Sequence, residues 1–132
     1  MNPETLKQFS QKYGLKKEHF HVDKRGFIII NRQGVETVQA VLNIQADYEP
    51  FLPWSDPDKG RFVMRCDASM MTTHGIRKVT TFGEVTPGNN KNAYPIAMSE
   101  KRALSRAVLK LAGMYGEGVY AADEMEDGDV EK

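Results

Sequence analysis

Three cationic side chains recur at intervals of four residues in the C-terminal third of the chain. Arg102, Arg106 and Lys110 lie in the segment AYPIAMSEKRALSRAVLKLAGMYG, residues 93–116, whose pattern predicts a helix. Because four residues make a little over one helical turn, the three cations form one stripe along that helix. A stripe of this kind binds a polyanion such as a nucleic-acid backbone, or it simply keeps one helical face in water. The segment alone is compatible with both interpretations.

Aromatic and amide side chains near this helix extend the first interpretation. Single-stranded nucleic acid is held by cations that follow its phosphates and by aromatic rings on which its bases stack. Phe82 and Tyr94 flank the polar loop TPGNNKN, residues 86–92, in which Asn89 and Asn90 offer donors to phosphate or sugar. The N-terminal end of the following helix adds positive partial charge. We therefore expect the nucleic-acid-binding residues to be Arg61, Arg65, Arg77, Lys78, Phe82, Asn90, Lys91, Tyr94, Lys101, Arg102, Arg106 and Lys110.

Charge is distributed unevenly along the chain, although its net charge is zero. Residues 123–132, DEMEDGDVEK, carry six acids and one base, which leaves 17 bases and 12 acids in residues 1–122. A basic body with an acidic tail is typical of nucleic-acid-binding proteins and of interaction tails, and a solvated tail without a partner is the competing interpretation. We expect one domain over residues 1–122 and a disordered tail over residues 123–132 that competes with DNA or recruits a protein partner.

Patterns for catalysis are missing from the sequence. There is no Gly-rich phosphate loop, no cysteine pair for zinc and no nucleophile motif, so we expect no enzyme activity, no catalytic residue and no cofactor. His19, His21 and Asp23 would share one face of a strand, where two imidazoles and a carboxylate suit a metal. Surface positions are the competing interpretation for these three residues, and we expect no metal site.

Sequence features also predict where the protein resides. No apolar run approaches the roughly 20 residues that a membrane span needs, and MNPETLKQF at the N-terminus lacks the apolar core of a signal peptide. The single Cys66 forms no internal disulfide, which suits a reducing compartment. We expect a cytoplasmic protein without membrane contact.

Hydrophobic patterns predict the first half of the fold. Leu6, Phe9 and Tyr13 recur at helical spacing, so a short N-terminal helix is expected. The apolar run FIII, residues 27–30, indicates a buried strand, and Gln33-Gly34 indicates a turn that opens a hairpin. In VQAVLNIQADY, residues 38–48, apolar and polar residues alternate, which predicts a long strand with one face in the core. Four prolines and glycines between residues 49 and 60 predict a loop.

Further alternation completes the expected architecture. RFVMRCDASM, residues 61–70, and IRKVTTFGEV, residues 76–85, indicate two strands joined by a turn at His74-Gly75. The expected fold class is α+β: an antiparallel β-meander of about four strands, a long C-terminal helix packed on one face of it, and a short N-terminal helix.

The long helix is expected to be amphipathic. Its apolar arc contains Ile96, Ala97, Ala103, Leu104, Ala107, Val108, Leu111 and Ala112, and the opposite side contains Ser99, Arg102, Arg106 and Lys110. Glu100 and Lys101 fall within the apolar arc. We expect the Lys101 stem to reach the edge of the sheet and Glu100 to pair with a strand cation such as Lys78.

The stretch TTFGEVTPGNNKNAYPIAMSEKRALSRAVLKLAG, residues 80–113, resembles phage single-strand annealing proteins of the essential-recombination-function (Erf) type. More broadly, it resembles the annealing superfamily with a β-β-β-α core that includes the eukaryotic recombination mediator. Tyr94-Pro95 stands where the Erf pattern has Gly-Ser. The resemblance implies a non-enzymatic, homo-oligomeric protein of a phage or mobile element that binds and anneals single-stranded DNA in the host cytoplasm. The alternative is a protein-binding adaptor or structural phage protein on the same fold, with the basic stripe as an oligomer contact.

Overall fold

The computed structural model describes residues 3–89 and 93–124. In this part of the chain the helices are α1 (Pro3–Tyr13), α2 (Arg32–Leu42) and α3 (Pro95–Ala112). The strands are β1 (Phe20–Val22), β2 (Ile28–Ile30), β3 (Gln45–Pro50), β4 (Phe62–Thr72), β5 (Gly75–Val85) and β6 (Val119–Ala121). The fold is α+β, as the sequence predicts, with a short N-terminal helix and a long helix near the C-terminal end that packs against a sheet.

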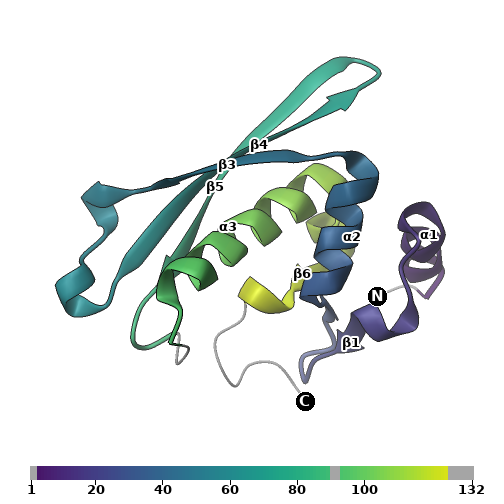
Figure 1. Ribbon diagram of the computed structural model, residues 1–132. Coiled ribbons are helices and arrows are strands. Elements are labelled where there is room, and N and C mark those ends of the chain that lie inside the picture. Colours follow the sequence, from purple (N-terminus) through teal and green to yellow (C-terminus); the bar gives the residue numbers. More distant parts are fainter. Residues whose placement is uncertain (1–2, 90–92, 125–132) are drawn as a thin grey trace.

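Two sheets form among the described residues. Strands β3, β4 and β5 make an antiparallel meander in that order, whereas β2 pairs antiparallel with β1 and parallel with β6 in a smaller sheet. Figure 1 shows the meander extending over α3, with α2 and β6 on the other side of that helix and α1 at the outside. The long helix is therefore covered from two sides, whereas the sequence predicts a helix on one face of a single sheet.

The β4–β5 hairpin confirms the two strands predicted from the alternating residues 61–70 and 76–85. Its register runs from Phe62 opposite Val85 to Thr72 opposite Gly75, so the predicted turn at His74-Gly75 is confirmed. Alternate residues of β4 face α3, and among them Cys66 is fully buried. Strand β3 adds to this hairpin through β4, with which it pairs in antiparallel register.

Residues 38–48 do not form the predicted long strand, because their first half belongs to α2. The Asn31 side chain caps this helix by accepting a hydrogen bond from the N–H of Gly34, and Asn43 ends it in the left-handed conformation at φ 52°. Val35 and Val38 are buried at helical spacing, so a helical pattern competes with the alternation over the same residues. Only the second half of the segment enters strand β3.

The predicted turn at Gln33-Gly34 is wrong, because both residues lie in the first turn of α2. Glycine serves close packing there. A Cβ added to Gly34 would lie 2.5 Å from Cγ1 of Ile30, so the first turn of α2 rests directly on strand β2. The buried strand predicted at residues 27–30 is confirmed as β2, but its antiparallel partner β1 precedes it in the chain.

Helix α3 approaches the meander sheet most closely at Gly83 of β5. A Cβ at this position would lie 2.0 Å from the carbonyl oxygen of Ser99 and 2.5 Å from the nitrogen of Ala103. The Thr81 hydroxyl donates a 2.6 Å hydrogen bond to the Ala103 carbonyl. These contacts hold the helix alongside the outermost strand of the meander, so the cations of α3 lie near the free edge of β5.

Candidate functional site

Arg102 joins three segments of the chain through its guanidinium group. Its Nε donates to the carbonyl of Asp123, at 2.9 Å, and its Nη1 donates to the carbonyl of Glu84, also at 2.9 Å. Asn89 accepts twice, through Oδ1 from Nη1 at 3.0 Å and through its carbonyl from Nη2 at 2.8 Å. Arg102 is only 4 % exposed. The expectation that it faces solvent is therefore wrong: the sequence could not foresee that β5, the following loop and the C-terminal segment converge on this side chain.

Arg106 lies one helical turn further along α3 and binds the main chain of β5 two residues before Glu84. Its Nη1 donates to the carbonyl oxygen of Phe82, and its Nε lies 3.7 Å from Oε1 of Glu124. About a third of its side chain remains exposed, in contrast to Arg102. Arg106 therefore combines a structural hydrogen bond with a surface that a ligand can reach.

The exposed cations of this region are Lys110 and Arg77. Lys110 occupies the last turn of α3, and Nη1 of Arg77 donates to the carbonyl of Leu111 at 3.4 Å. We use the term cationic edge for Arg102, Arg106, Lys110 and Arg77, which follow the free side of β5 and the end of α3. The stripe predicted from the sequence is thus retained as a line of charge, although its first member is buried.

Carboxylates from the C-terminal segment lie on this cationic edge. The 3-10 turn Ala122–Glu124 packs against α3, where the Ser105 hydroxyl donates to Oδ2 of Asp123 at 3.2 Å and the Tyr115 hydroxyl donates to Glu124. Burial raises the pKa of Glu124, and the N–H of Ala121 and the charges of Arg106 and Lys110 offset only part of that rise.

Burial likewise raises the pKa of Asp123, against the hydrogen bond from Ser105. The boundary expected after residue 122 is therefore too early, because Asp123 and Glu124 are packed parts of the domain. The remainder of the expected tail, residues 125–132, lies outside the described residues.

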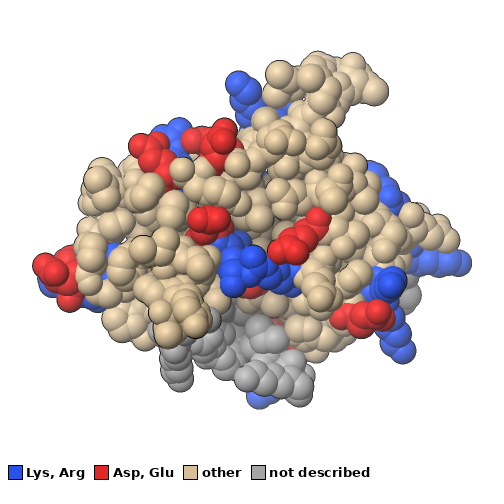
Figure 2. Space-filling view, viewed as in Figure 1, with Lys and Arg blue, Asp and Glu red and all other residues tan. Residues whose placement is uncertain are grey.

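The sheet face turned away from α3 carries more acids than bases. The register places Asp47, Glu49, Asp67 and Glu84 on this face together with Arg65 and Lys78. Arg65 pairs with Asp67 at 3.0 Å, and the hydrogen bonds from Thr80 and Arg65 lower the pKa of Asp67. In the view of Figure 2, basic and acidic residues are likewise interspersed and form no continuous basic band. The sheet face itself therefore offers a polyanion no excess of positive charge, and the cationic edge lies beside it.

The other predicted residues are dispersed. Arg61 is exposed at the start of β4, where it forms an isolated bridge with Asp56. Lys101 is half-buried on α3, and Tyr94 is 71 % exposed at its N-terminal end. Asn89 accepts hydrogen bonds from Arg102 and from the N–H of Thr86. The predicted residues Asn90 and Lys91 lie outside the described part of the chain.

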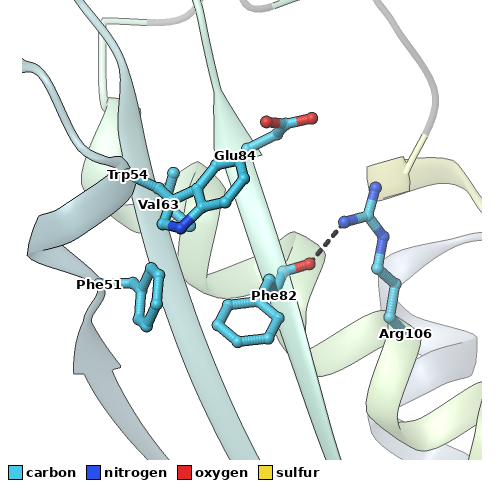
Figure 3. Close-up of a pocket in the computed structure, with 6 residues that line it drawn as sticks. All are labelled: Phe51, Trp54, Val63, Phe82, Glu84 and Arg106. Carbon is cyan, nitrogen blue, oxygen red and sulfur yellow. Dashed lines mark hydrogen bonds between the residues drawn. The ribbon is translucent and has the colours of Figure 1, made fainter.

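A cavity of about 380 Å³ opens beside the cationic edge. It is lined by Phe51, Trp54, Val63, Phe82, Glu84 and Arg106. The rings of Phe51 and Phe82 meet edge to face at 5.1 Å between centroids, and Trp54 is 68 % exposed. Figure 3 shows Glu84 and Arg106 on the same side of the cavity, away from Phe51. We call this site the aromatic pocket.

Sequence reasoning identified Phe82 but missed Phe51 and Trp54. Both lie in the segment FLPW, which the prolines marked as a loop. In the structure, the N–H of Phe51 donates to the carbonyl of Val63 at 2.8 Å, and the short turn Leu52–Trp54 follows. The only tryptophan of the chain, set among prolines, was the available signal for an exposed aromatic side chain.

Of the three residues considered for a metal, His19 and Asp23 have local partners, whereas Nε2 of His21 is buried without a hydrogen-bond partner. Nδ1 of His19 accepts from the N–H of Lys16 at 2.9 Å, and the Asp23 carboxylate pairs with Arg25 at 2.8 Å. Burial would raise the pKa of Asp23, but the hydrogen bonds from Arg25 and from the N–H of Phe27 lower it. Among the described residues, no three histidine, cysteine or acidic side chains gather as a metal site requires.

Comparison of the chain with protein-family models, with curated proteins and with solved structures finds no match. Within residues 3–89 and 93–124, no helix has the length and apolar character to cross a membrane. The cationic edge and the aromatic pocket beside it are therefore the features of this structure that indicate a function.

Proposed function

We propose that this protein is a non-enzymatic single-stranded DNA-binding and strand-annealing protein of a phage or mobile element. The observation that supports this function best is the line of cations along the free side of β5, next to an exposed cluster of aromatic rings. Cations that follow phosphates and rings that stack on bases are the two parts of sequence-tolerant single-strand binding.

In this proposal the strand runs along the cationic edge. Arg106, Lys110 and Arg77 contact phosphates. Arg102 is buried and stabilises the edge by donating hydrogen bonds to the carbonyls of Glu84 and Asn89. Bases stack on Phe82, which is 39 % exposed on the adjoining sheet face. The acids on that face repel phosphates, which keeps the backbone at the edge and leaves the face to the bases.

The C-terminal carboxylates compete with DNA in this arrangement. Glu124 already lies beside Arg106, and the sequence continues with four further acids in residues 125–132. Removal of residues 125–132 therefore tightens binding at low salt if these acids reach the same cations, since like charges near the site oppose the phosphates. An unchanged affinity leaves protein recruitment as the role of the tail.

Assembly into a homo-oligomer belongs to the same proposal, and β3 is the strand suited to it. The carbonyls of Phe82 and Glu84 on the β5 edge are already occupied by arginines. Strand β3 is the opposite edge of the meander, and an uncovered edge strand is a template for pairing with a second copy. Sedimentation at micromolar concentration, with and without DNA, distinguishes the oligomer from a monomer.

Fluorescence polarisation with a labelled single-stranded oligonucleotide tests the proposed function. Counterion release predicts binding at ~50 mM salt and an affinity that falls steeply as salt is added. The proposal is wrong if no binding occurs at ~50 mM salt, where non-specific electrostatic binders are still held.

A protein-binding adaptor remains the second candidate. The exposed side chains of Leu52 and Trp54, which are 75 % and 68 % accessible, favour it, because apolar surface of this kind is common at protein interfaces. An adaptor predicts no binding of oligonucleotides at any salt concentration, so the same titration separates the two functions.

A further inference from the structure

The aromatic pocket combines flat apolar walls with a charged rim. Phe82 and Phe51 form one part of the wall, and Trp54 and Val63 also line the pocket; Val63 is only 8 % exposed. Glu84 and Arg106 stand at the rim (Figure 3). The main-chain oxygen of Glu84 accepts from Arg102, whereas no hydrogen bond joins its carboxylate to another described residue. The pocket therefore offers aromatic faces together with a carboxylate that can still accept hydrogen bonds.

These features select a planar ligand that carries donors at its edge. Aromatic walls favour a flat ring system through stacking, which contributes about 1–3 kcal/mol per base in single-strand binding proteins. An apolar side chain from a partner would use the walls but leave a carboxylate and a guanidinium beside it without compensation, and charged residues are depleted at the centres of protein interfaces. A nucleobase can stack on the aromatic walls and also form hydrogen bonds with the charged groups at the rim.

Guanine is the base whose hydrogen-bonding edge fits a carboxylate. Its N1–H and N2–H groups are adjacent donors that two carboxylate oxygens accept together. Adenine and cytosine place an acceptor next to their amino group, and thymine has one N–H between two carbonyls, so none of them offers this pair. Arg106, on the same side of the pocket, is placed to hold a phosphate attached to the bound nucleotide.

We propose that the aromatic pocket binds one unstacked guanine of a single strand, with its ring against Trp54 and Phe82 and its N1–H and N2–H groups donating to Glu84. This inference rests on the proposed function, since it assigns a base preference to the strand held at the cationic edge. It adds a specific contact to a surface that otherwise recognises only phosphate and ring faces.

Trp54 is the only tryptophan of the chain, so its fluorescence reports directly on the pocket. The experiment titrates the full chain with two oligonucleotides of about 10 nucleotides, within the length that such sites cover. One contains only thymine and the other carries a single central guanine. Polarisation of a labelled strand measures overall binding, and Trp54 emission measures occupation of the pocket in the same samples.

Two variants test the role of the carboxylate. Glu84→Gln removes the pair of acceptors, and Glu49→Gln is the matched control. This control removes the same charge from the same sheet face. Glu49 lies opposite Arg65 in the β3–β4 register and does not line the pocket. The expected result for the natural chain and for Glu49→Gln is roughly fivefold tighter binding of the guanine strand, with quenching of Trp54, the low end for a bidentate contact. Glu84→Gln is expected to bind both strands equally.

Three results would overturn the inference without touching the proposed function. The first is binding detected by polarisation without a change in Trp54 emission. This result agrees with the proposed function but shows that no base enters the pocket. The second is equal affinity for both strands in the natural chain. The third is a change of Trp54 emission with protein concentration alone, which indicates that a second copy covers the pocket. Absence of binding to either strand overturns the proposed function as well.

Discussion

Replacing Arg102 with glutamine is expected to destabilise the fold strongly. The side chain is 4 % exposed and donates four hydrogen bonds of 2.8–3.0 Å, to Asp123, Glu84 and twice to Asn89. Hydrogen bonds to charged groups contribute about 1.5–3 kcal/mol each. The full sum is not lost, because water and the new amide satisfy part of the acceptors and losses above about 4–5 kcal/mol are exceptional. We expect a loss of about 3–4 kcal/mol.

Urea unfolding followed by far-UV circular dichroism measures this loss. With an m value of about 1.5–2 kcal/mol/M for a domain of this size, the midpoint should fall by about 2 M. Lys110→Gln is the control, because it removes the same charge from an exposed position on the same helix and should change stability by less than about 0.5 kcal/mol. Indistinguishable midpoints for the two variants would refute the structural role assigned to Arg102.

Three further substitutions or conditions test other parts of the structure. Gly83→Ala should cost at least ~3 kcal/mol in a urea melt, because its Cβ would lie 2.0 Å from a main-chain oxygen of α3; a normal midpoint contradicts the close approach. Burial raises the pKa of Glu124, so its ionisation opposes folding. Stability should decline as pH rises from the ordinary value of 4.5 through the raised pKa, and Glu124→Gln should flatten that decline; equal pH profiles argue against burial. Burial raises the pKa of Cys66 to about 11, so the native thiol should resist alkylation at neutral pH and react only after unfolding.

Local patterns predict the fold well where one interaction dominates. In β4 and β5, alternate residues face either α3 or solvent, and the alternation is long enough to be recognised. The pattern misleads over residues 38–48, where Val38 and Leu42 satisfy both a strand and a helix. There the caps at Asn31 and Asn43 select the helix. Strands β1 and β6 have three residues each, which is too short for a periodic signal.

The candidate site was predicted only in part, because helical spacing gives the positions of residues on one helix but not the segments that pack against them. The spacing predicts that Arg102, Arg106 and Lys110 lie along one side of α3, and in the structure they do. Whether each cation faces water depends on which segments cover it, and the loop at Asn89 and the C-terminal segment at Asp123 both lie outside α3. The helical pattern does not specify how they fold back over Arg102. Trp54 was missed because its environment is created by the register of β3 and β4, which sequence periodicity does not specify.

The salt dependence of DNA binding by two double variants tests the cationic edge most directly. Arg77→Gln/Lys110→Gln removes two exposed cations from the edge, whereas Lys7→Gln/Lys24→Gln removes two exposed cations from α1 and from the turn between β1 and β2. Each lost single-strand phosphate contact lowers the slope of log K against log salt by ~0.7. We predict a slope reduced by up to ~1.4 for the edge variant and an unchanged slope for the control. An unchanged slope in a folded edge variant, or an equal reduction in the control, would contradict binding at this edge.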